Sequence, residues 1–136
     1  MIRRATDADL PRISEIRNGV RENRLSDPSR VTIEDVKWFI ANPGIFVWEE
    51  AGTIAGFSAA DPRNASIWAL FVEEQFEGRG IGSALLAEAC AVLAGHRLAR
   101  IWLTTEPGSR AEGFYRRAGW EIVGERDGDL LLEKGI

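Results

Sequence analysis

The chain has little of the chemistry that metal and redox proteins use, since it contains one cysteine and one histidine in 136 residues. A single cysteine excludes an internal disulfide. One cysteine and one histidine also cannot supply the ligands of a zinc-type site, so no metal is expected. We interpret Cys90 as a small apolar helix residue and His96 as a helix-end residue that complements the helix dipole.

Long apolar runs and an excess of positive charge are also missing. No stretch approaches about eighteen apolar residues, and no charged start followed by an apolar segment opens the chain. Neither a membrane span nor an export signal is therefore predicted, and we expect a cytoplasmic protein. The net charge of −4 argues against a general binder of nucleic acids or membrane surfaces.

Apolar and aromatic residues, by contrast, are plentiful. Apolar residues make up 45% of the chain, and five tryptophans and six phenylalanines add large side chains for burial. A chain of this length and composition can form one hydrophobic core of its own. No internal repeat, low-complexity segment or linker interrupts it, so we expect a single domain over residues 1–136.

The hydrophobic pattern predicts a mixture of strands and helices. Thr6 with Asp9, and Thr32 with Asp35, have the spacing of helix-capping residues. Short apolar runs bounded by turn residues indicate strands. The predicted order is strand 2–4, helices from residues 10 and 32, strands 44–50, 53–60 and 67–72, a helix from residue 81, strand 101–105, helix 109–118 and a final hairpin, 121–133.

The most informative segment is a glycine-rich junction between a predicted strand and a predicted helix. Gly78, Gly80 and Gly82 alternate shortly after the strand pattern of residues 67–72, and the helix pattern starts at Ile81. Glycines let main-chain N–H groups approach a ligand closely, and the start of a helix favours anions. This segment therefore predicts a phosphate-binding loop.

The spacing of these glycines excludes two common phosphate loops. The chain has no Gly-x-x-x-x-Gly-Lys-Ser/Thr motif, and its Gly-x-Gly-x-Gly differs from the Gly-x-Gly-x-x-Gly of dinucleotide folds. An acidic ribose-binding residue about twenty residues further on is also absent, since that stretch reads Arg97 to Arg100. We therefore expect neither a nucleoside triphosphatase nor a dinucleotide enzyme.

A second informative segment is the predicted helix over residues 109–118. Its apolar stripe, at helical spacing, includes Phe114 and Tyr115, which directs Tyr115 inward. Gly119 suits the left-handed position that follows many helices. The pattern thus predicts a tyrosine that faces the interior from a short helix.

Together these two segments resemble the motifs of the GNAT N-acetyltransferases. The stretch from Val72 to Ser83 resembles that family's acetyl-CoA loop, and residues 111–120 resemble its second motif. Glu77 departs from the family pattern, because Gln or Arg is usual there, and so does Gly108, where Asn is common. The resemblance implies an α/β (α+β) GNAT fold, in which about four helices flank a central mixed, mostly antiparallel sheet of six or seven strands.

The resemblance also implies acetyl-CoA as co-substrate. The cofactor arm would pair with the main chain of the strand that leads into the loop, and a main-chain N–H near Val72 could stabilise the developing oxyanion. Because a carboxylate would repel the pyrophosphate, we expect Glu77 to point away and Arg79 to assist the loop. The implied cofactor-binding residues are Leu70, Phe71, Val72, Gly78, Arg79, Gly80, Ile81, Gly82, Ser83 and Phe114.

In the family, the tyrosine of the second motif lies close to the CoA sulfur and acts as the general acid, which implies this role for Tyr115. The attacking amine must be neutral, and a carboxylate could accept its proton. Our candidate for this base is Glu22, with Glu73 and Glu74 as alternatives.

The acceptor side of the site is less defined by the sequence. We expect Trp48 and Trp68 to lie on adjacent strands and to form walls of the acceptor cleft. The acceptor would be an amine of a small molecule or a peptide. Family members are often dimers, and the hairpin at residues 121–133 could pair across the interface of a homodimer.

Three functions are compatible with these observations. The first is an N-acetyltransferase. The second is a catalytically silent acyl-CoA binding or sensing domain, which the departures at Glu77 and Gly108 keep open. The third is a protein-interaction module that uses the fold without CoA.

Overall fold

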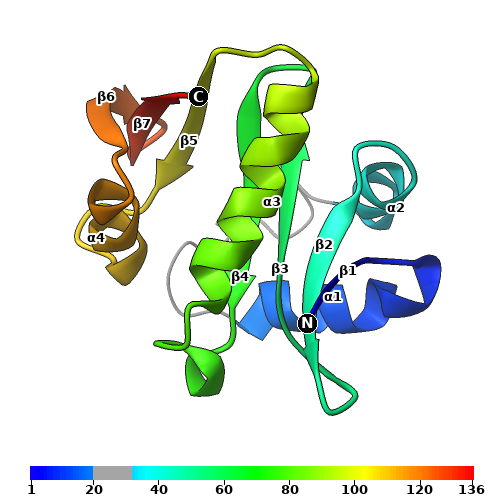
Figure 1. Ribbon diagram of the computed structural model, residues 1–136. Coiled ribbons are helices and arrows are strands. Elements are labelled where there is room, and N and C mark those ends of the chain that lie inside the picture. Colours follow the sequence, from blue (N-terminus) through cyan, green and yellow to red (C-terminus); the bar gives the residue numbers. More distant parts are fainter. Residues whose placement is uncertain (20–31) are drawn as a thin grey trace.

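The computed structural model describes residues 1–19 and 32–136 (Figure 1). Seven strands form one sheet in the order β1-β2-β3-β4-β5-β7-β6. Among these described strands, β4 and β5 run parallel, and the other neighbours are antiparallel. The strands are β1 (Ile2–Arg4), β2 (Ile45–Glu50), β3 (Thr53–Asp61), β4 (Ser66–Val72), β5 (Arg100–Thr105), β6 (Glu121–Arg126) and β7 (Asp129–Gly135).

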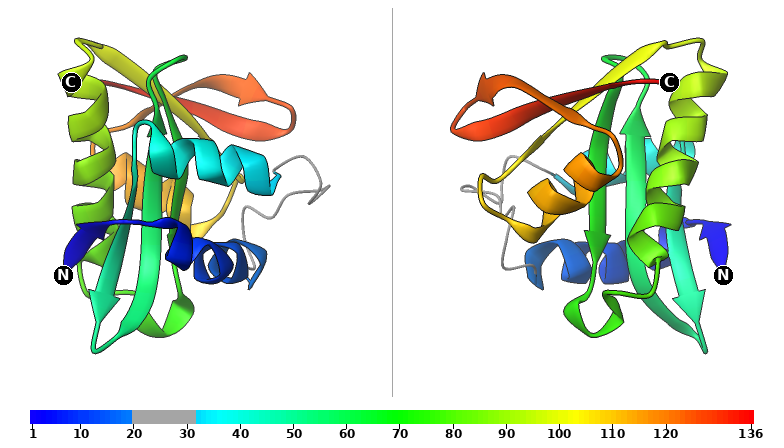
Figure 2. Two further views of the ribbon diagram at one scale, coloured as in Figure 1. Left: turned by 90° about the vertical axis from the view of Figure 1, so that its right-hand side faces the viewer. Right: turned by 60° about the vertical axis from the view of Figure 1, so that its left-hand side comes forward.

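Four α-helices lie among the described residues and cover both faces of the sheet. They are α1 (Leu10–Gly19), α2 (Ile33–Ala41), α3 (Ile81–Gly95) and α4 (Arg110–Arg117), and the short 3-10 turns η1 (Asp7–Asp9) and η3 (Glu74–Phe76) precede α1 and α3. Helices α1 and α2 lie on one face and α3 on the other (Figures 1 and 2). The predicted fold class and element order are confirmed.

Two capping boxes fix the starts of the first helices, as their spacing predicted. The Thr32 N–H donates to the Asp35 carboxylate at 2.9 Å, and the Asp35 N–H donates back to the Thr32 hydroxyl at 3.2 Å. The Thr6 N–H donates to Asp9 at 2.8 Å. Asp9 also accepts hydrogen bonds from the Arg3 guanidinium, which lowers the pKa of this carboxyl and joins β1 to the helical segment.

Apolar side chains from the helices fill both faces of the sheet. Ile13 and Ile16 of α1 and Phe39 of α2 pack on one face, and residues of α3 such as Leu85 and Leu93 pack on the other. Strand β3 is buried along nearly its whole length because it is covered from both sides. The centre of the sheet is therefore a well-packed support for the elements at its edges.

Strands β4 and β5 are joined at one end only. Their ladder consists of the single pair Ser66 and Trp102. Within β4, Trp68 is an extra residue between two registered pairs with β3, and such a bulge bends a strand. Beyond Ser66 the two strands separate (Figure 2), so the end of β4 has no partner strand on this side among the described residues.

The lengths and compositions of the helices also bear on membrane insertion. Over residues 1–19 and 32–136, no helix combines the length and the apolar character that crossing a membrane requires.

Gly56 of β3 is predicted to be essential for the close approach of β3 and β4. A Cβ atom at this position would lie 2.4 Å from the Phe71 carbonyl oxygen, so Gly56→Ala must push the strands apart. We expect a loss of roughly 1–3 kcal/mol in the free energy of unfolding, measured in urea. Gly124→Ala in β6 is the matched control, because a Cβ there meets nothing within 4 Å. Equal stabilities of the two variants would contradict the prediction.

Candidate active site

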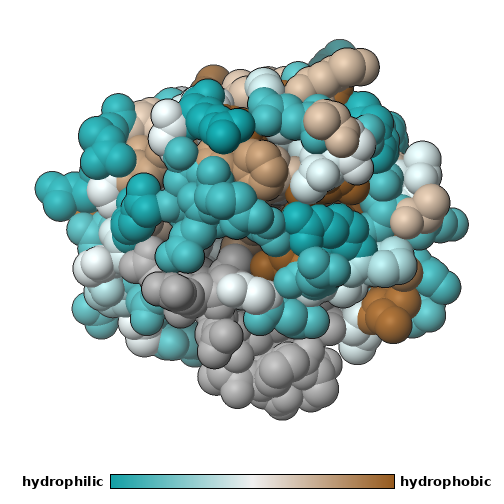
Figure 3. Space-filling model, turned by 90° about the horizontal axis from the view of Figure 1, so that it is seen from below, coloured by the Kyte–Doolittle hydropathy of each residue, from teal (hydrophilic) through white to brown (hydrophobic). Residues whose placement is uncertain are grey.

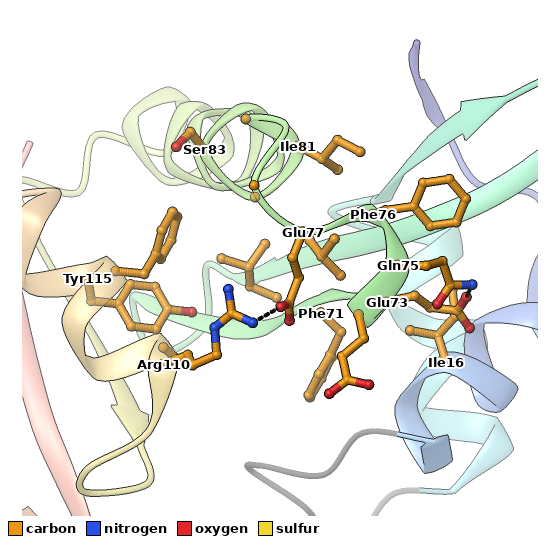
Figure 4. Close-up of a pocket in the computed structure, with 18 of the residues that line it drawn as sticks. Ile16, Phe71, Glu73, Gln75, Phe76, Glu77, Ile81, Ser83, Arg110 and Tyr115 are labelled. Carbon is orange, nitrogen blue, oxygen red and sulfur yellow. Dashed lines mark hydrogen bonds and ion pairs between the residues drawn. The ribbon is translucent and has the colours of Figure 1, made fainter.

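A cleft of about 730 Å³ lies where β4 and β5 separate (Figure 4). It is lined by the end of β4, the glycine loop with the start of α3, and α4, while Ile16 and Gly19 of α1 contribute a further wall. The view in Figure 3 shows a largely hydrophilic described surface on which hydrophobic residues form small separate patches. The cleft thus joins the two segments that the sequence analysis singled out.

The end of β4 offers main-chain groups to this cleft. Leu70, Phe71 and Val72 all line it. A strand edge without a neighbour presents N–H and C=O groups in a regular row, which can bind an extended ligand as an additional strand would. The implied binding site for a cofactor arm therefore has a suitable geometry here.

The glycine loop gives the cleft an anion-binding end. Gly78 and Gly80 have positive φ angles of 79° and 80°, and Gly80 is the N-cap of α3. A Cβ atom at either glycine would meet no protein atom within 4 Å, so the space beside the loop is open. The first N–H groups of a helix have no partner within the helix, and here Ile81, Gly82 and Ser83 line the cleft.

The charged side chains of the loop are arranged in the opposite way to the prediction. Glu77 was expected to point away, yet it lines the cleft and binds Arg110 of α4. Arg79 was expected to assist the loop, but it does not line the cleft. Its guanidinium donates to Glu50 at 3.2 Å and lies 5.4 Å from the centre of the Phe76 ring. The expectation that Glu77 points away was wrong, because Arg110 of α4 lies opposite this carboxylate and holds it in the cleft.

Tyr115 faces the cleft from α4, and its hydroxyl points into it (Figure 4). The residue is 6% exposed and packs edge-on against Phe114 and Trp120, with ring centres 5.3 and 5.8 Å away. Burial raises the pKa of Tyr115 well above its ordinary value, so the phenol, which is neutral at pH 7, also stays neutral at higher pH. Among the described residues the hydroxyl has no hydrogen-bond partner, so it can donate to a bound molecule.

Trp48 and Trp68 occupy other places than expected. They lie on β2 and β4, which are not adjacent because β3 runs between them, and neither lines the cleft. Trp48 packs with the cluster beneath the start of α3. Trp68 stacks on Phe39 with ring centres 3.9 Å apart, and the Arg17 guanidinium lies 5.2 Å from the Trp68 ring. Both tryptophans therefore contribute to packing in this structure.

The carboxylates considered as general bases differ in their surroundings. Glu22 lies outside the described residues. Glu73 lines the cleft, but its carboxylate lies 3.0 Å from the Arg12 guanidinium and accepts a hydrogen bond from Gln75 at 2.7 Å. Both contacts engage the carboxylate of Glu73. Glu74 also lines the cleft.

The described residues contain no group of three or more histidine, cysteine, aspartate or glutamate side chains that could hold a metal ion. Among the described residues, the cleft offers main-chain N–H groups, the tyrosine hydroxyl and charged side chains. This combination suits the binding of a phosphate-bearing ligand and the donation of a proton.

Comparison with known proteins assigns the chain to a family. Residues 10–120 match the acetyltransferase (GNAT) family, and the chain belongs to it. Among individual proteins, it is 36% identical over 113 residues to an uncharacterised N-acetyltransferase of Methanocaldococcus jannaschii. That alignment covers 74% of this chain and 50% of the relative, so the chain spans about half of the relative's length.

Solved structures show the same fold. A ribosomal-protein-alanine N-acetyltransferase from Brucella melitensis is 25% identical, with a TM-score of 0.79 and coverage of 100% of this chain and 99% of the other. PaiA N-acetyltransferase from Thermoplasma acidophilum, solved in complex with coenzyme A, is 17% identical, with a TM-score of 0.82 and coverage of 100% and 98%.

Sequence reasoning missed Arg110, the residue that binds Glu77. A signal for it was present, because a carboxylate beside a predicted anion loop requires a neighbouring cation. The sequence did not reveal which of its arginines supplies that cation, since Arg110 is 33 residues away in the chain.

The raised pKa of Tyr115 predicts a delayed spectroscopic titration, which is easily read because this is the only tyrosine. In the folded protein, phenolate absorbance should appear well above pH 10, whereas the denatured chain should titrate near pH 10. The unfolded state then releases a proton that the folded state retains. Stability should therefore fall by about 1.4 kcal/mol per pH unit above about pH 10. Tyr115→Phe should lack this contribution, and an absorbance step near pH 10 in the folded protein would contradict the buried phenol.

Proposed function

We propose that this protein transfers an acetyl group from acetyl-CoA to an amine of a small molecule or a peptide, by direct attack within a ternary complex. One observation carries the proposal. A single cleft combines an open strand edge, an anion-binding helix start and a neutral tyrosine hydroxyl. These are the features that an extended, phosphate-bearing thioester and its leaving sulfur require.

The residues of the cleft fit acetyl-CoA in three places. The main chain of Leu70–Val72 would hold the extended arm, the N–H groups beside Gly78–Ser83 would hold the pyrophosphate, and Phe114 would contact the arm from α4. Arg79 would contribute through its main chain, since it is not among the residues whose side chains line the cleft. The thioester would supply an acetyl carbon open to attack by an amine.

Tyr115 would serve the departing sulfur. As the amine nitrogen bonds to the carbonyl carbon and the carbon–sulfur bond breaks, negative charge collects on sulfur, and a hydroxyl can donate to it. The phenol carries its proton at neutral pH. The pKa of a phenol lies above that of an ordinary thiol, about 8.5, and burial of Tyr115 widens this difference, so the hydroxyl would donate a hydrogen bond to the departing sulfur and complete transfer of its proton would be unfavourable.

The proton of the attacking amine would pass to a carboxylate or a water chain. Glu22 remains our predicted base, and it lies outside the described residues. The acceptor itself is proposed only as an amine. Trp48 and Trp68 are no longer proposed as cleft walls, because β2 and β4 hold them in packed clusters.

Two other functions from the sequence analysis are less well supported. An interaction module would not need a glycine loop open beside a helix start. A silent acyl-CoA binder would not need a buried tyrosine hydroxyl that points into the cleft. The single-domain organisation of residues 1–136, the cytoplasmic location and the homodimer remain predictions.

Two measurements test the proposed function. Thermal denaturation with and without acetyl-CoA tests binding, and we expect a higher unfolding temperature at millimolar acetyl-CoA. Release of free CoA thiol over a panel of small amines and amino-terminal peptides tests transfer. Absence of binding would contradict both CoA-based functions, while binding without thiol release from any amine would favour the silent domain.

Tyr115→Phe is predicted to lower turnover while leaving the affinity for acetyl-CoA nearly unchanged. The phenylalanine ring keeps the packing against Phe114 and Trp120 but removes the donor. We expect kcat to fall about 10- to 100-fold, at or below the lower end of general acid–base effects. Steady-state kinetics and calorimetric binding measure the two quantities. An unchanged kcat would exclude Tyr115 as the proton donor.

Gly80→Ala is predicted to weaken acetyl-CoA binding at least tenfold, because its Cβ would enter the open space beside the loop. The positive φ of 80° adds backbone strain, which must be separated from the effect on binding. Gly128→Ala, with a φ of 87° in the β6–β7 turn, imposes the same kind of strain away from the cleft. Equal affinities in the two variants would show that the loop does not hold the cofactor.

A further inference from the structure

An ion pair spans the candidate cofactor cleft from wall to wall. The Arg110 guanidinium, in the first turn of α4, donates to the Glu77 carboxylate, which directly precedes the glycine loop (Figure 4). Both residues line the cleft. The Arg110 guanidinium is therefore held next to the residue that precedes the glycine loop.

Glu77 creates an electrostatic problem that this arrangement solves. The proposed ligand carries a pyrophosphate, and a lone carboxylate beside its subsite would repel it. Glu77 directly precedes Gly78, so its carboxylate stands at the start of the loop. Arg110 brings a compensating positive charge to this carboxylate from a different element.

The other charged groups around the cleft do not fill this role. Glu73 is already paired with Arg12 at 3.0 Å. Arg79 does not line the cleft, and its guanidinium lies 3.2 Å from the Glu50 carboxylate. Arg117 lines the cleft, but its guanidinium lies against the backbone of its own helix at Gly113. A Cβ atom added to Gly113 would be 3.1 Å from the Arg117 guanidinium. Among the described residues, Arg110 is thus the guanidinium that faces the start of the loop.

We propose that Arg110 supplies the cation of the pyrophosphate subsite and that Glu77 positions it there. This inference rests on the proposed use of acetyl-CoA. The side chain of Arg110 is 72% exposed and that of Glu77 is 29% exposed, so water screens the attraction between them. A guanidinium has five N–H donors in a planar fork, and it can bind a phosphate while it retains a bond to a carboxylate.

The test removes the cation and then restores it at the other residue. Arg110→Gln should weaken CoA binding about 10- to 100-fold by calorimetry, as expected for a lost charge-assisted hydrogen bond. Adding Glu77→Arg to this variant places a cation at the start of the loop and should bring the affinity back to within about threefold of the original. Arg116→Gln is the control, because Arg116 lies on the same helix and pairs with Glu112 at 3.6 Å but does not line the cleft.

Dephospho-CoA identifies the phosphate involved. It retains the pyrophosphate and lacks the 3′-phosphate, so Arg110→Gln should weaken its binding by the same factor as that of CoA. A loss confined to CoA would assign Arg110 to the 3′-phosphate and overturn the proposal. So would an affinity within twofold of the original in Arg110→Gln, an equal loss in the Arg116 control, or a failure of Glu77→Arg to restore binding.

The proposed function can fail separately. If the unaltered protein binds CoA but releases no thiol with any amine, acetyl transfer is wrong while the binding comparison remains decisive for Arg110. If transfer occurs and the Arg110 and Arg116 variants bind CoA alike, only the role of Arg110 is wrong.

Discussion

The separation of β4 from β5 after a single ladder pair is the constraint on which the site depends. In a continuous parallel ladder, β5 would satisfy the main chain of Leu70–Val72 and leave no space for a ligand. The bulge at Trp68 bends β4, and the stacking of Trp68 on Phe39 fixes that bend against α2. Packing on one face of the sheet thus keeps a strand edge open beside the other elements of the cleft.

The cleft relies on charge pairing between elements that are distant in the chain. Arg12 of α1 neutralises Glu73 after β4, and Arg110 of α4 neutralises Glu77 before α3. Each pair crosses from one structural element to another, so the local charge balance exists only in the folded protein. This explains how a protein with a net charge of −4 can offer a binding site for a polyanion.

The sequence predicted those parts of the structure that depend on neighbouring residues. Capping boxes, the element order and the positive φ of Gly119 all follow from local patterns, and the structure agrees. The directions of the side chains at the site could not be predicted from local patterns, because they depend on contacts between segments that are distant in the sequence. The partner of Glu77 comes from α4, and β3 separates the strands of Trp48 and Trp68. Sequence patterns therefore predicted which segments form the site, but not how the charged side chains are arranged within it.

The choice of arginine over lysine around the cleft has a chemical consequence. The sequence contains two lysines, Lys37 and Lys134, and neither is among the residues that line the cleft. An ammonium group that loses its proton becomes a nucleophile that a thioester can acetylate, whereas a guanidinium keeps its proton and has no free lone pair. Under the proposed function, the cleft therefore attracts an activated acetyl donor without exposing it to an amine of the enzyme's own, which protects the protein from self-modification.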